Sequence, residues 1–264
     1  MAGEKAIFIT GGASGIGQAV ARLFAARGWR VGLADVNAAG LEATRAMLPE
    51  GLATTHIMDV RDRDAWLASL TAFTAASGGR LDLLFNNAGI AVGGLLADTA
   101  FAEIDRLVGI NIVGVINGAR IGHSFLKATP GSCLLNTASA AGIYGSPGLA
   151  LYTASKFAVR GLTEALDGEW AADGIRVRSV MPSFINTPLL DAVTQGSNRT
   201  ARDSVRAAGL EFTPVEEVAE RIWDAAHGDR LHTVIGKTAR RLAFAARWMP
   251  GTLRKQMRRG ALGR

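Results

Sequence analysis

Seven short apolar segments alternate with longer segments of helical periodicity along this chain of 264 residues. The apolar segments run almost unbroken, as is typical of strands in a parallel sheet that helices cover on both faces. Strands alternating with helices in this way predict a doubly wound α/β sheet of about seven parallel strands. The expected strands are 5–10, 30–35, 53–58, 81–86, 132–137, 175–181 and 232–236, and the expected helices are 15–27, 38–48, 62–77, 99–127, 151–172 and 215–227.

No internal repeat, low-complexity tract or linker divides the chain, so a single domain is the simplest prediction. We expect residues 1–236 to form this domain and residues 237–264 to form a basic amphipathic extension. Within the domain, the polar segment 188–213 has no clear strand. A long segment of this kind is more often a mobile lid or substrate loop than structureless chain.

The positive net charge of +6 belongs to the C-terminal extension, because residues 237–264 contain nine basic residues and no acidic one. Phe244 and Trp248 lie four residues apart there, with arginines expected mainly on other sides of a helix that Pro250 ends. Such a helix suits packing on a partner subunit, contact with an anionic membrane surface, or attraction of an acidic ligand. A nucleic-acid partner is not expected, because no recognition motif accompanies the charge.

Several features favour a cytoplasmic protein. No apolar run approaches the ~18 residues of a membrane-spanning helix, and Met1–Lys5 leads directly into an apolar strand, which leaves no room for a secretory signal. The single cysteine, Cys133, cannot form an internal disulfide and lies in an apolar run that predicts a core position. The four histidines show no metal-ligand spacing, so no metal is expected.

A glycine-rich turn follows the first expected strand and opens the first expected helix, in the sequence Gly11-Gly-Ala-Ser-Gly15-Ile-Gly17. Glycines let the backbone approach a pyrophosphate, and a helix N-terminus offers free N–H donors to it. Asp35 ends the second strand, where a carboxylate can accept hydrogen bonds from ribose hydroxyls. A 2′-phosphate would be repelled there, and neither Ser14 nor Val36 supplies a cation, so NAD(H) is predicted over NADP(H).

Tyr152 and Lys156 stand one turn apart on one face of an expected helix. A fixed ammonium beside a phenol favours the phenolate and lowers the phenol's pKa, which makes a workable general acid or base.

Together these motifs resemble those of the short-chain dehydrogenase/reductase family, over roughly residues 4 to 236. The spacing Thr10-Gly11-x-x-x-Gly15-x-Gly17 is this family's variant of the dinucleotide-binding glycine motif. Asp59-Val60 resembles the family's adenine contact, although a helix-capping role for Asp59 stays open. Asn86-Asn87-Ala88-Gly89 resembles the family's signature for shaping the cofactor cleft. The resemblance implies a single-domain Rossmann-type fold, in which residues 1–236 are expected to form the dinucleotide-binding catalytic domain.

The resemblance also implies catalytic roles. Ser139, 13 residues before Tyr152, would hydrogen-bond the substrate oxygen; Tyr152 would exchange the proton; and Lys156 would lower the tyrosine pKa and hold the nicotinamide ribose. Asn111 would hold a water that relays protons to the lysine, although structural satisfaction of its amide is an open alternative.

The stretch Pro182-Ser-Phe-Ile-Asn-Thr187 resembles the family's nicotinamide loop, in which the threonine holds the carboxamide. Ser183 replaces the usual glycine and would restrict the backbone if its φ were positive. Arg178 stands where the family often has asparagine.

The expected catalytic residues are Asn111, Ser139, Tyr152 and Lys156. The expected NAD-binding residues are Gly11, Ser14, Gly15, Ile16, Gly17, Asp35, Asp59, Val60, Asn87, Ala88, Gly89, Tyr152, Lys156, Pro182 and Thr187. The expected substrate contacts are Ser139, Tyr144, Tyr152 and Phe184, in a mostly apolar pocket wall.

We therefore expect an oxidoreductase that transfers a hydride between NAD(H) and a secondary alcohol or ketone, with an apolar wall that suits a lipophilic substrate. Two alternatives are a 3-oxoacyl-thioester reductase that uses NADP(H) and a catalytically idle scaffold that senses a dinucleotide. Family members usually form dimers or tetramers, so a homodimer or homotetramer is expected.

Overall fold

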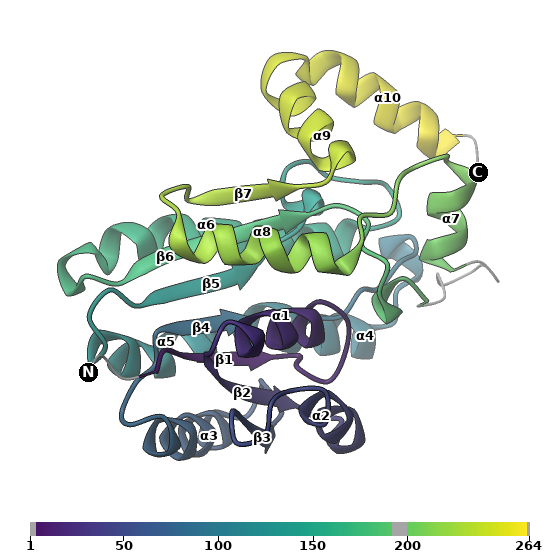
Figure 1. The fold of residues 1–264 in the computed structure, drawn as a ribbon. Coiled ribbons are helices and arrows are strands. Elements are labelled where there is room, and N and C mark those ends of the chain that lie inside the picture. Colours follow the sequence, from purple (N-terminus) through teal and green to yellow (C-terminus); the bar gives the residue numbers. More distant parts are fainter. Residues whose placement is uncertain (1–3, 192–199, 263–264) are drawn as a thin grey trace.

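A seven-stranded parallel sheet forms the centre of the computed structural model, which describes residues 4–191 and 200–262 (Figure 1). Its strand order is β3-β2-β1-β4-β5-β6-β7, so the chain winds outward from β1 in one direction and then from β4 in the other. The predicted doubly wound fold is confirmed. The strands are β1 (Ala6–Thr10), β2 (Arg30–Asp35), β3 (Ala53–Ile57), β4 (Leu83–Asn86), β5 (Cys133–Thr137), β6 (Arg176–Pro182) and β7 (His232–Ile235).

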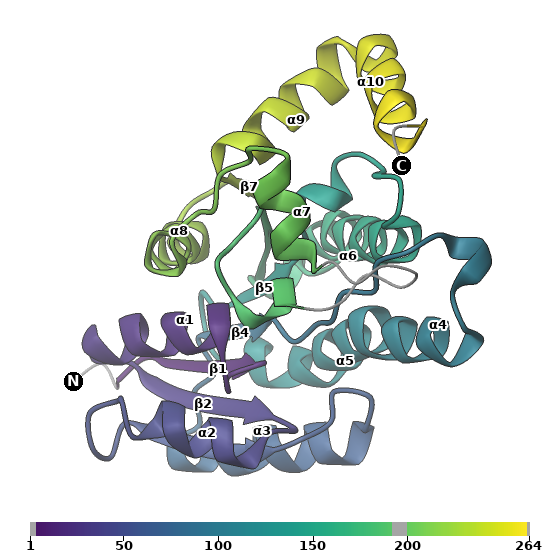
Figure 2. The same ribbon diagram turned by 90° about the vertical axis from the view of Figure 1, so that its right-hand side faces the viewer.

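Helices cover both faces of this sheet (Figure 2). One face packs against α1, α2 and α8, and the other against α3, α5 and α6. The helices are α1 (Gly15–Ala26), α2 (Ala38–Arg45), α3 (Arg63–Ala76), α4 (Phe101–Val108), α5 (Gly114–Lys127), α6 (Ala150–Glu169), α7 (Ala201–Ala207), α8 (Val215–His227), α9 (Lys237–Trp248) and α10 (Pro250–Leu262).

Two apolar clusters, one on each face, explain why the strand sequences run almost unbroken. Phe24 of α1 and Ile222 of α8 pack on one face, and Trp66 and Phe73 of α3 pack on the other. Consecutive strand residues point to opposite faces, so each must be apolar when both faces are buried. All five residues of β1 are buried accordingly. Cys133 is buried as expected, and burial raises its thiol pKa to about 11.

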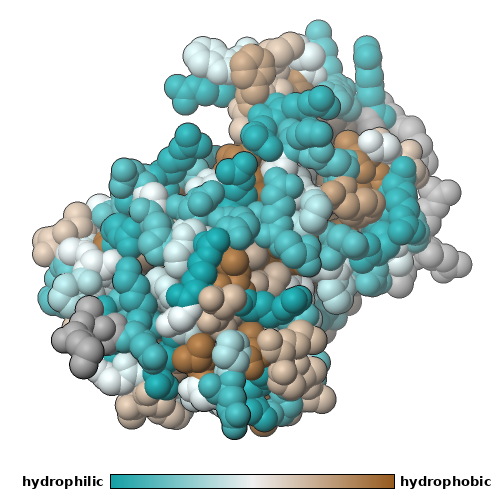
Figure 3. Space-filling view, in the orientation of Figure 1, coloured by the Kyte–Doolittle hydropathy of each residue, from teal (hydrophilic) through white to brown (hydrophobic). Residues whose placement is uncertain are grey.

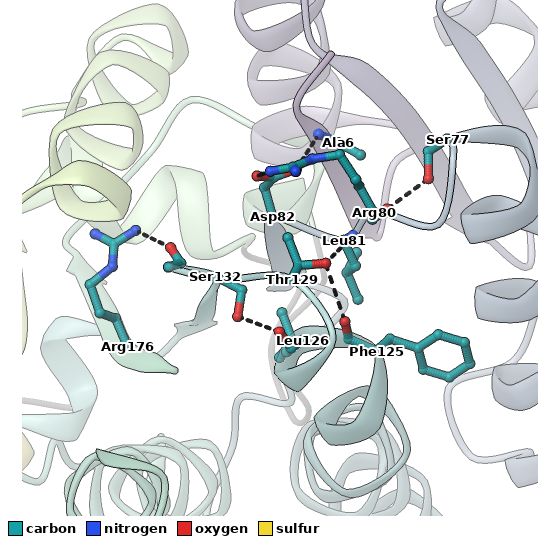
Figure 4. A network of polar contacts seen from close by, with 11 residues as sticks. Ala6, Ser77, Arg80, Leu81, Asp82, Phe125, Leu126, Thr129, Ser132 and Arg176 are labelled. Atoms are coloured by element: carbon teal, nitrogen blue, oxygen red, sulfur yellow. Dashed lines mark hydrogen bonds and ion pairs between the residues drawn. The ribbon is translucent and has the colours of Figure 1, made fainter. Parts of the chain in front are cut away.

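The amino ends of the central strands are closed by a polar network of side chains (Figure 4). The Asp82 carboxylate accepts a hydrogen bond from the Ala6 amide at 2.9 Å and pairs with the Arg80 guanidinium. The Thr129 hydroxyl accepts from the Leu81 amide at 3.0 Å. These side chains satisfy backbone donors that the sheet leaves unpaired at this edge. The carboxyl ends of the strands meet at the opposite edge, where open α/β sheets generally bind their ligands.

The predicted helix 99–127 consists of three consecutive helical segments rather than one regular α-helix. A π-helical segment, Gly109–Val113, joins α4 to α5 and contains the buried Asn111. Such wide turns occur where a side chain in the helix makes contacts that regular α-helical geometry would not allow. The difference from the prediction therefore coincides with an expected catalytic residue.

The two ends of the segment 188–213 are brought together by an isolated β-bridge between Ile185 and Thr213. It contains a short 3-10 turn, Pro188–Asp191, and α7, which begins with a capping box between Thr200 and Asp203. Arg202 of α7 donates to the Thr187 carbonyl at 3.0 Å. Residues 192–199 lie outside the described part of the chain, and the role of this segment as a substrate loop stays a prediction.

The C-terminal extension forms two helices, and α10 begins at the expected break, Pro250. The expected separation of arginines from aromatic residues is wrong. Phe244 and Trp248 are exposed together with Arg240, Arg241 and Arg247, because α9 packs on β7 through small residues such as the buried Ala239. Figure 3 shows hydrophobic side chains among hydrophilic ones at this end of the molecule. The division into 1–236 and 237–264, and contacts of the tail with a subunit or membrane, stay predictions.

Replacing Asp82 with alanine should lower the free energy of unfolding by about 2–4 kcal/mol, because it leaves the buried Ala6 amide unpaired and Arg80 without its partner. Urea denaturation measures this change. The matched control is Asp105→Ala, an exposed position in α4 where we expect a change within about 0.5 kcal/mol. A loss no larger in Asp82→Ala than in the control would contradict the role assigned to the network.

Candidate active site

The glycine-rich turn between β1 and α1 is shaped by backbone positions that a side chain would obstruct. Gly11 and Gly15 have φ of +70° and +55°, in the left-handed region that favours glycine. A Cβ added at Gly17 would lie 2.1 Å from the Gly11 carbonyl oxygen. Ser14 caps α1 without a side-chain hydrogen bond, so the first amides of the helix keep their donors for a ligand. Ile16 packs against the core beneath the turn.

Asp35 lies at the carboxyl end of β2 beside this turn. Its carboxylate accepts from the Ala13 amide at 3.3 Å and from the Asn37 amide at 3.0 Å. These bonds hold an anionic group against the glycine-rich turn. The neighbouring Ser14 and Val36 are exposed and uncharged.

Thr10 joins the glycine-rich turn to the end of β4. Its hydroxyl oxygen accepts hydrogen bonds from the amides of Asn87 and Ala88, each at 3.0 Å. The Asn87 side chain donates in return to the Thr10 carbonyl at 3.0 Å. A Cβ at Gly11 would lie 2.9 Å from the side-chain amide nitrogen of Asn87, so glycine is needed for this contact. Asn86 instead bonds Asn136 and the Val115 carbonyl, within the core.

Lys156 projects from α6 toward the end of β5 and is buried. Its ammonium donates to the Thr137 carbonyl at 2.8 Å, and the Thr137 hydroxyl donates to the Asn87 side chain at 3.3 Å. Burial lowers the pKa of Lys156 to about 8. A continuous series of hydrogen bonds thus runs from Lys156 through Thr137 and Asn87 to Thr10 and the glycine-rich turn.

Tyr152 lies one turn before Lys156 on α6, as predicted, and forms a side-chain hydrogen bond with Ser139. The expected lowering of the Tyr152 pKa by the Lys156 ammonium is not observed. Burial raises the pKa of the Tyr152 phenol, and the hydrogen bond with Ser139 offsets this only in part. The Lys156 ammonium lies 5.6 Å from the centre of the tyrosine ring and is turned toward Thr137, so it does not offset the loss of solvation.

Asn111 is fully buried, and its side-chain amide holds the segment after β4. The amide oxygen accepts from the Ile90 amide and the nitrogen donates to the Ile90 carbonyl, both at 2.9 Å. The nitrogen also lies 3.2 Å from the Ser155 hydroxyl on α6. A Cβ at Gly89 would lie 3.3 Å from the Asn111 oxygen and 3.6 Å from the Lys156 nitrogen, so these three residues converge. The oxygen and the nitrogen of the Asn111 side chain therefore both have hydrogen-bond partners within the protein. The relay role stays a prediction.

Asp59 and Val60 follow β3. The Asp59 carboxylate pairs with the Arg61 guanidinium at 2.6 Å, which lowers the pKa of the carboxyl. It does not cap α3, because Asp62 does so by accepting from the amides of Asp64 and Ala65. Val60 is buried, close to Thr10 and Ala88. The adenine contact assigned to both residues stays a prediction.

The nicotinamide-loop segment begins at Pro182, the last residue of β6, which pairs with Ile235 of β7. No described non-glycine residue has a positive φ, so Ser183 adopts its position without the restriction considered for it. Thr187 is buried against the glycine-rich turn, where a Cβ at Gly15 would lie 3.2 Å from its side chain. Arg178 forms an ion pair with Asp167 at 2.6 Å.

The expected substrate residues divide between two places. Tyr144 lines a cavity of about 500 Å³ with α6 and α10. Phe184 is half-buried, bonds Thr213 through its backbone, and does not line that cavity. Among the described residues, no cluster of histidine, cysteine or acidic side chains is able to hold a metal ion. No helix in the described ranges is long and apolar enough to cross a membrane.

Three residues outside the predicted set hold the site together: Thr10, Thr137 and Ser155. Thr10 and Thr137 end buried strands next to a predicted motif. A polar residue at the carboxyl end of a buried strand is a usable sequence signal for such a role. Ser155 stands between Tyr152 and Lys156, and its spacing alone does not distinguish it from any other helical serine.

These features fit a nicotinamide dinucleotide. The glycine-rich turn forms a backbone cradle that side chains at positions 11, 15 and 17 would fill. The first turn of α1 offers free amides, and Asp35 ends the adjacent strand. Tyr152, Ser139 and Lys156 lie across the same carboxyl edge of the sheet, past β5. A phosphate cradle and a proton-exchanging side chain therefore share one edge.

Comparison with known proteins agrees with this geometry. The family model described as short chain dehydrogenase matches residues 5–198. Meso-2,3-butanediol dehydrogenase of Serratia marcescens is 37% identical over 82% of this chain and 84% of that protein. The 3-oxoacyl-[acyl-carrier-protein] reductase FabG of Thermotoga maritima is 33% identical over 83% of this chain and 88% of that protein.

A solved short-chain dehydrogenase/reductase from Burkholderia phymatum, described as a complex with NAD, superposes with a TM-score of 0.82. It is 27% identical and covers 96% of this chain and 95% of its own. The chain therefore belongs to the short-chain dehydrogenase/reductase family and is an oxidoreductase of the class that acts on alcohols and ketones.

Proposed function

We propose that this protein transfers a hydride between NAD(H) and a lipophilic secondary alcohol or ketone, with Tyr152 as the proton-exchanging residue. One observation carries the proposal. Tyr152 is hydrogen-bonded to Ser139 one helical turn from a buried lysine, at the edge of the sheet that carries the glycine-rich turn. A buried, positioned phenol is a suitable general acid or base, and the hydroxyl beside it can bind the same substrate oxygen.

Particular residues of the chain are suited to hold the dinucleotide. The glycine-rich turn and the first amides of α1 would bind the pyrophosphate, and Asp35 would accept from the adenosine ribose hydroxyls. Lys156 would hold the nicotinamide ribose, and Thr187 the carboxamide. The bound nicotinamide supplies the hydride donor or acceptor. The NAD complex of the Burkholderia phymatum relative supports a dinucleotide at this site.

Tyr152 and Ser139 have different roles at the substrate oxygen. In ketone reduction the Tyr152 hydroxyl gives its proton to the oxygen on which negative charge develops, and Ser139 donates a hydrogen bond to that oxygen. In alcohol oxidation the tyrosine must first be ionised so that it can accept the alcohol proton. Because burial raises the Tyr152 pKa, the protonated form that serves reduction dominates at neutral pH.

A 3-oxoacyl-thioester reductase is the alternative with a specific observation behind it, the identity with the Thermotoga maritima protein. Asp35 argues against it, because a carboxylate held beside the ribose would repel the 2′-phosphate of NADPH. An idle dinucleotide-sensing scaffold is the other alternative. It gives no reason for a buried lysine and a tyrosine–serine pair to be kept beside the cleft.

Replacing Tyr152 with phenylalanine should lower turnover by roughly 10²–10⁴-fold, the usual contribution of a general acid or base, while NAD binding is retained. Ser124→Ala is the matched control, because it also removes one hydroxyl, from an exposed position on α5. We expect it to keep turnover within about tenfold. The measurements are NADH absorbance with a panel of secondary alcohols and calorimetric NAD binding. Equal activity in Tyr152→Phe and the unmodified enzyme would overturn the catalytic assignment.

The raised Tyr152 pKa predicts opposite pH dependences for the two directions. Alcohol oxidation needs the phenolate, so its kcat should rise as the pH increases from 7 to 9.5. Ketone reduction needs the phenol, so its kcat should be level near neutrality and fall as the tyrosine ionises. Initial rates in both directions at saturating cofactor test this. An oxidation rate that falls between pH 7 and 9 would exclude a base with a raised pKa.

Cofactor preference should depend on Asp35. We expect kcat/KM to be at least about tenfold higher with NAD than with NADP, and the ratio to shrink in Asp35→Ser, because the repulsion of the 2′-phosphate is removed. Asp62→Ser, which changes a carboxylate at the start of α3, is the control and should leave the ratio unchanged. Higher kcat/KM with NADP in the unmodified enzyme would refute the NAD assignment.

A further inference from the structure

The outward side of α9 carries aromatic and basic side chains together. Phe244 and Trp248 are 60% and 65% exposed, although large aromatic side chains are mostly buried in proteins. Arg240 and Arg241 precede Phe244 by four and three residues, and Arg247 follows it by three. All three arginines are exposed. Residues three or four apart are neighbours on a helix, so these five side chains share one side of α9, which we call the α9 face.

The other side of α9 attaches the helix to the domain. Ala239 is buried there, and Leu242 and Ala246 are partly buried. The helix contacts β7 and the 3-10 turn Ala140–Gly142. Figures 1 and 2 show α9 and α10 beyond the β7 side of the sheet, outside the helical layers that cover it. The α9 face is therefore presented to the surroundings at one end of the molecule.

The positive charge of the α9 face is not neutralised by neighbouring carboxylates. None of its three arginines forms an ion pair within the part of the chain that the structure describes. Arg247 lies over the Trp248 ring, 5.3 Å from its centre. Glu211 pairs with Lys237 at 3.7 Å, but at the opposite end of α9 from Trp248. The extension itself contains no acidic residue.

The basic character continues into α10. This helix exposes further basic side chains, at Arg254, Lys255, Arg258 and Arg259. All 23 acidic residues of the chain precede the extension, in a part of the sequence where basic residues nearly balance them. The molecule therefore has one strongly positive end, and the exposed rings of α9 belong to it.

A membrane surface rich in anionic lipids matches both properties of the α9 face. Trp and Phe rings are stabilised at the headgroup level of a bilayer, and arginines are attracted to anionic headgroups. Neither property is sufficient alone, because two rings bury little apolar area and exposed charges are screened by salt. Attachment to a bilayer generally needs two such signals together.

Other occupants match the α9 face less well. In a twofold-symmetric contact the same surface meets itself. The arginines of one α9 face would then lie against those of the other, and neither extension has a carboxylate to place between them. Duplex nucleic acid would contact the arginines through its phosphates, but it offers no apolar layer to Phe244 and Trp248.

We propose that the α9 face docks on a membrane surface rich in anionic phospholipids, with Phe244 and Trp248 at the headgroup level and the three arginines against the headgroup phosphates. The helix that docks lies beyond the residues 5–198 matched by the family model. Docking does not depend on the reaction that the enzyme catalyses, so it is tested separately from the proposed function.

Co-sedimentation of the full chain with vesicles tests the proposal. One set of vesicles contains phosphatidylcholine alone, and the other contains phosphatidylcholine and phosphatidylglycerol in equal shares. The unmodified chain should pellet with the anionic vesicles and stay in solution with the neutral ones. Raising the salt concentration from about 50 to 500 mM should weaken the binding, because charges near a surface are screened. Tyr152→Phe should pellet like the unmodified chain.

The contribution of charge is measured with Arg241→Gln/Arg247→Gln. This variant should lower the partition constant on anionic vesicles by about tenfold or more, since each basic residue near an anionic surface contributes roughly fivefold. The matched control is Arg22→Gln/Arg120→Gln, which removes two exposed arginines from α1 and α5. We expect the control to stay within about threefold of the unmodified chain.

The contribution of the rings is measured with Phe244→Ser/Trp248→Ser, which should also lower the partition constant by about tenfold or more. The matched control is Leu67→Ser/Phe101→Ser, which removes two exposed apolar side chains from α3 and α4 and should leave binding unchanged. Anionic vesicles should shift the tryptophan emission of the unmodified chain to shorter wavelength. Trp248→Phe should still bind but lose this shift. Thermal melting of each variant checks that it is folded.

Equal pelleting with neutral and anionic vesicles, or pelleting with neither, would overturn the proposal. Equal losses in a variant and its matched control would do the same. Analytical ultracentrifugation tests the second copy as occupant: an oligomer that Phe244→Ser/Trp248→Ser dissociates, without binding of the unmodified chain to vesicles, would assign the α9 face to subunit contact instead. Vesicle binding that this variant retains in full, and that duplex DNA displaces, would show attraction by charge alone and refute the docking face.

Discussion

The buried ammonium of Lys156 and its hydrogen bond to the Thr137 carbonyl connect the two halves of the site. From Thr137 the contacts continue through Asn87 to Thr10, crossing from β5 to β4 and β1. Each of these residues lies at or just past the carboxyl end of its strand. A side chain that moved in one half would therefore disturb the other. A buried cation without a carboxylate partner is costly, and burial already lowers the Lys156 pKa to about 8.

These strand ends and the segments that follow them approach one another closely because glycines leave room between them. Gly11 admits the Asn87 amide, Gly89 admits Asn111 beside Lys156, and Gly114 admits Val60. The π-helical turn at Gly109–Val113 places Asn111 where both of its amide atoms meet Ile90. The opposite edge of the sheet is organised in the reverse way. There the polar side chains of Asp82, Thr129 and Ser132 form hydrogen bonds with backbone groups.

The basic residues of the C-terminal extension lie in two different environments. In α9, arginines are exposed together with Phe244 and Trp248. In α10, Arg254 and Arg258 line a cavity. The residues proposed to exchange a proton with an alcohol or ketone, Ser139, Tyr152 and Lys156, lie outside the extension.

The sequence by itself determined the sheet, its parallel direction and the positions of the motifs, because unbroken apolar runs and glycine spacing reflect local and short-range requirements. The glycine-rich turn, Asp35, Ser139, Tyr152 and Lys156 lie at one edge of that sheet. Only the tertiary structure decided that Lys156 faces Thr137 rather than the phenol, so that burial raises the Tyr152 pKa. It also decided that Phe244 and Trp248 are exposed together with the arginines of α9, and that Arg254 and Arg258 line one cavity with Tyr144. These outcomes depend on burial and on contacts between residues far apart in the chain, neither of which periodicity or motif spacing contains.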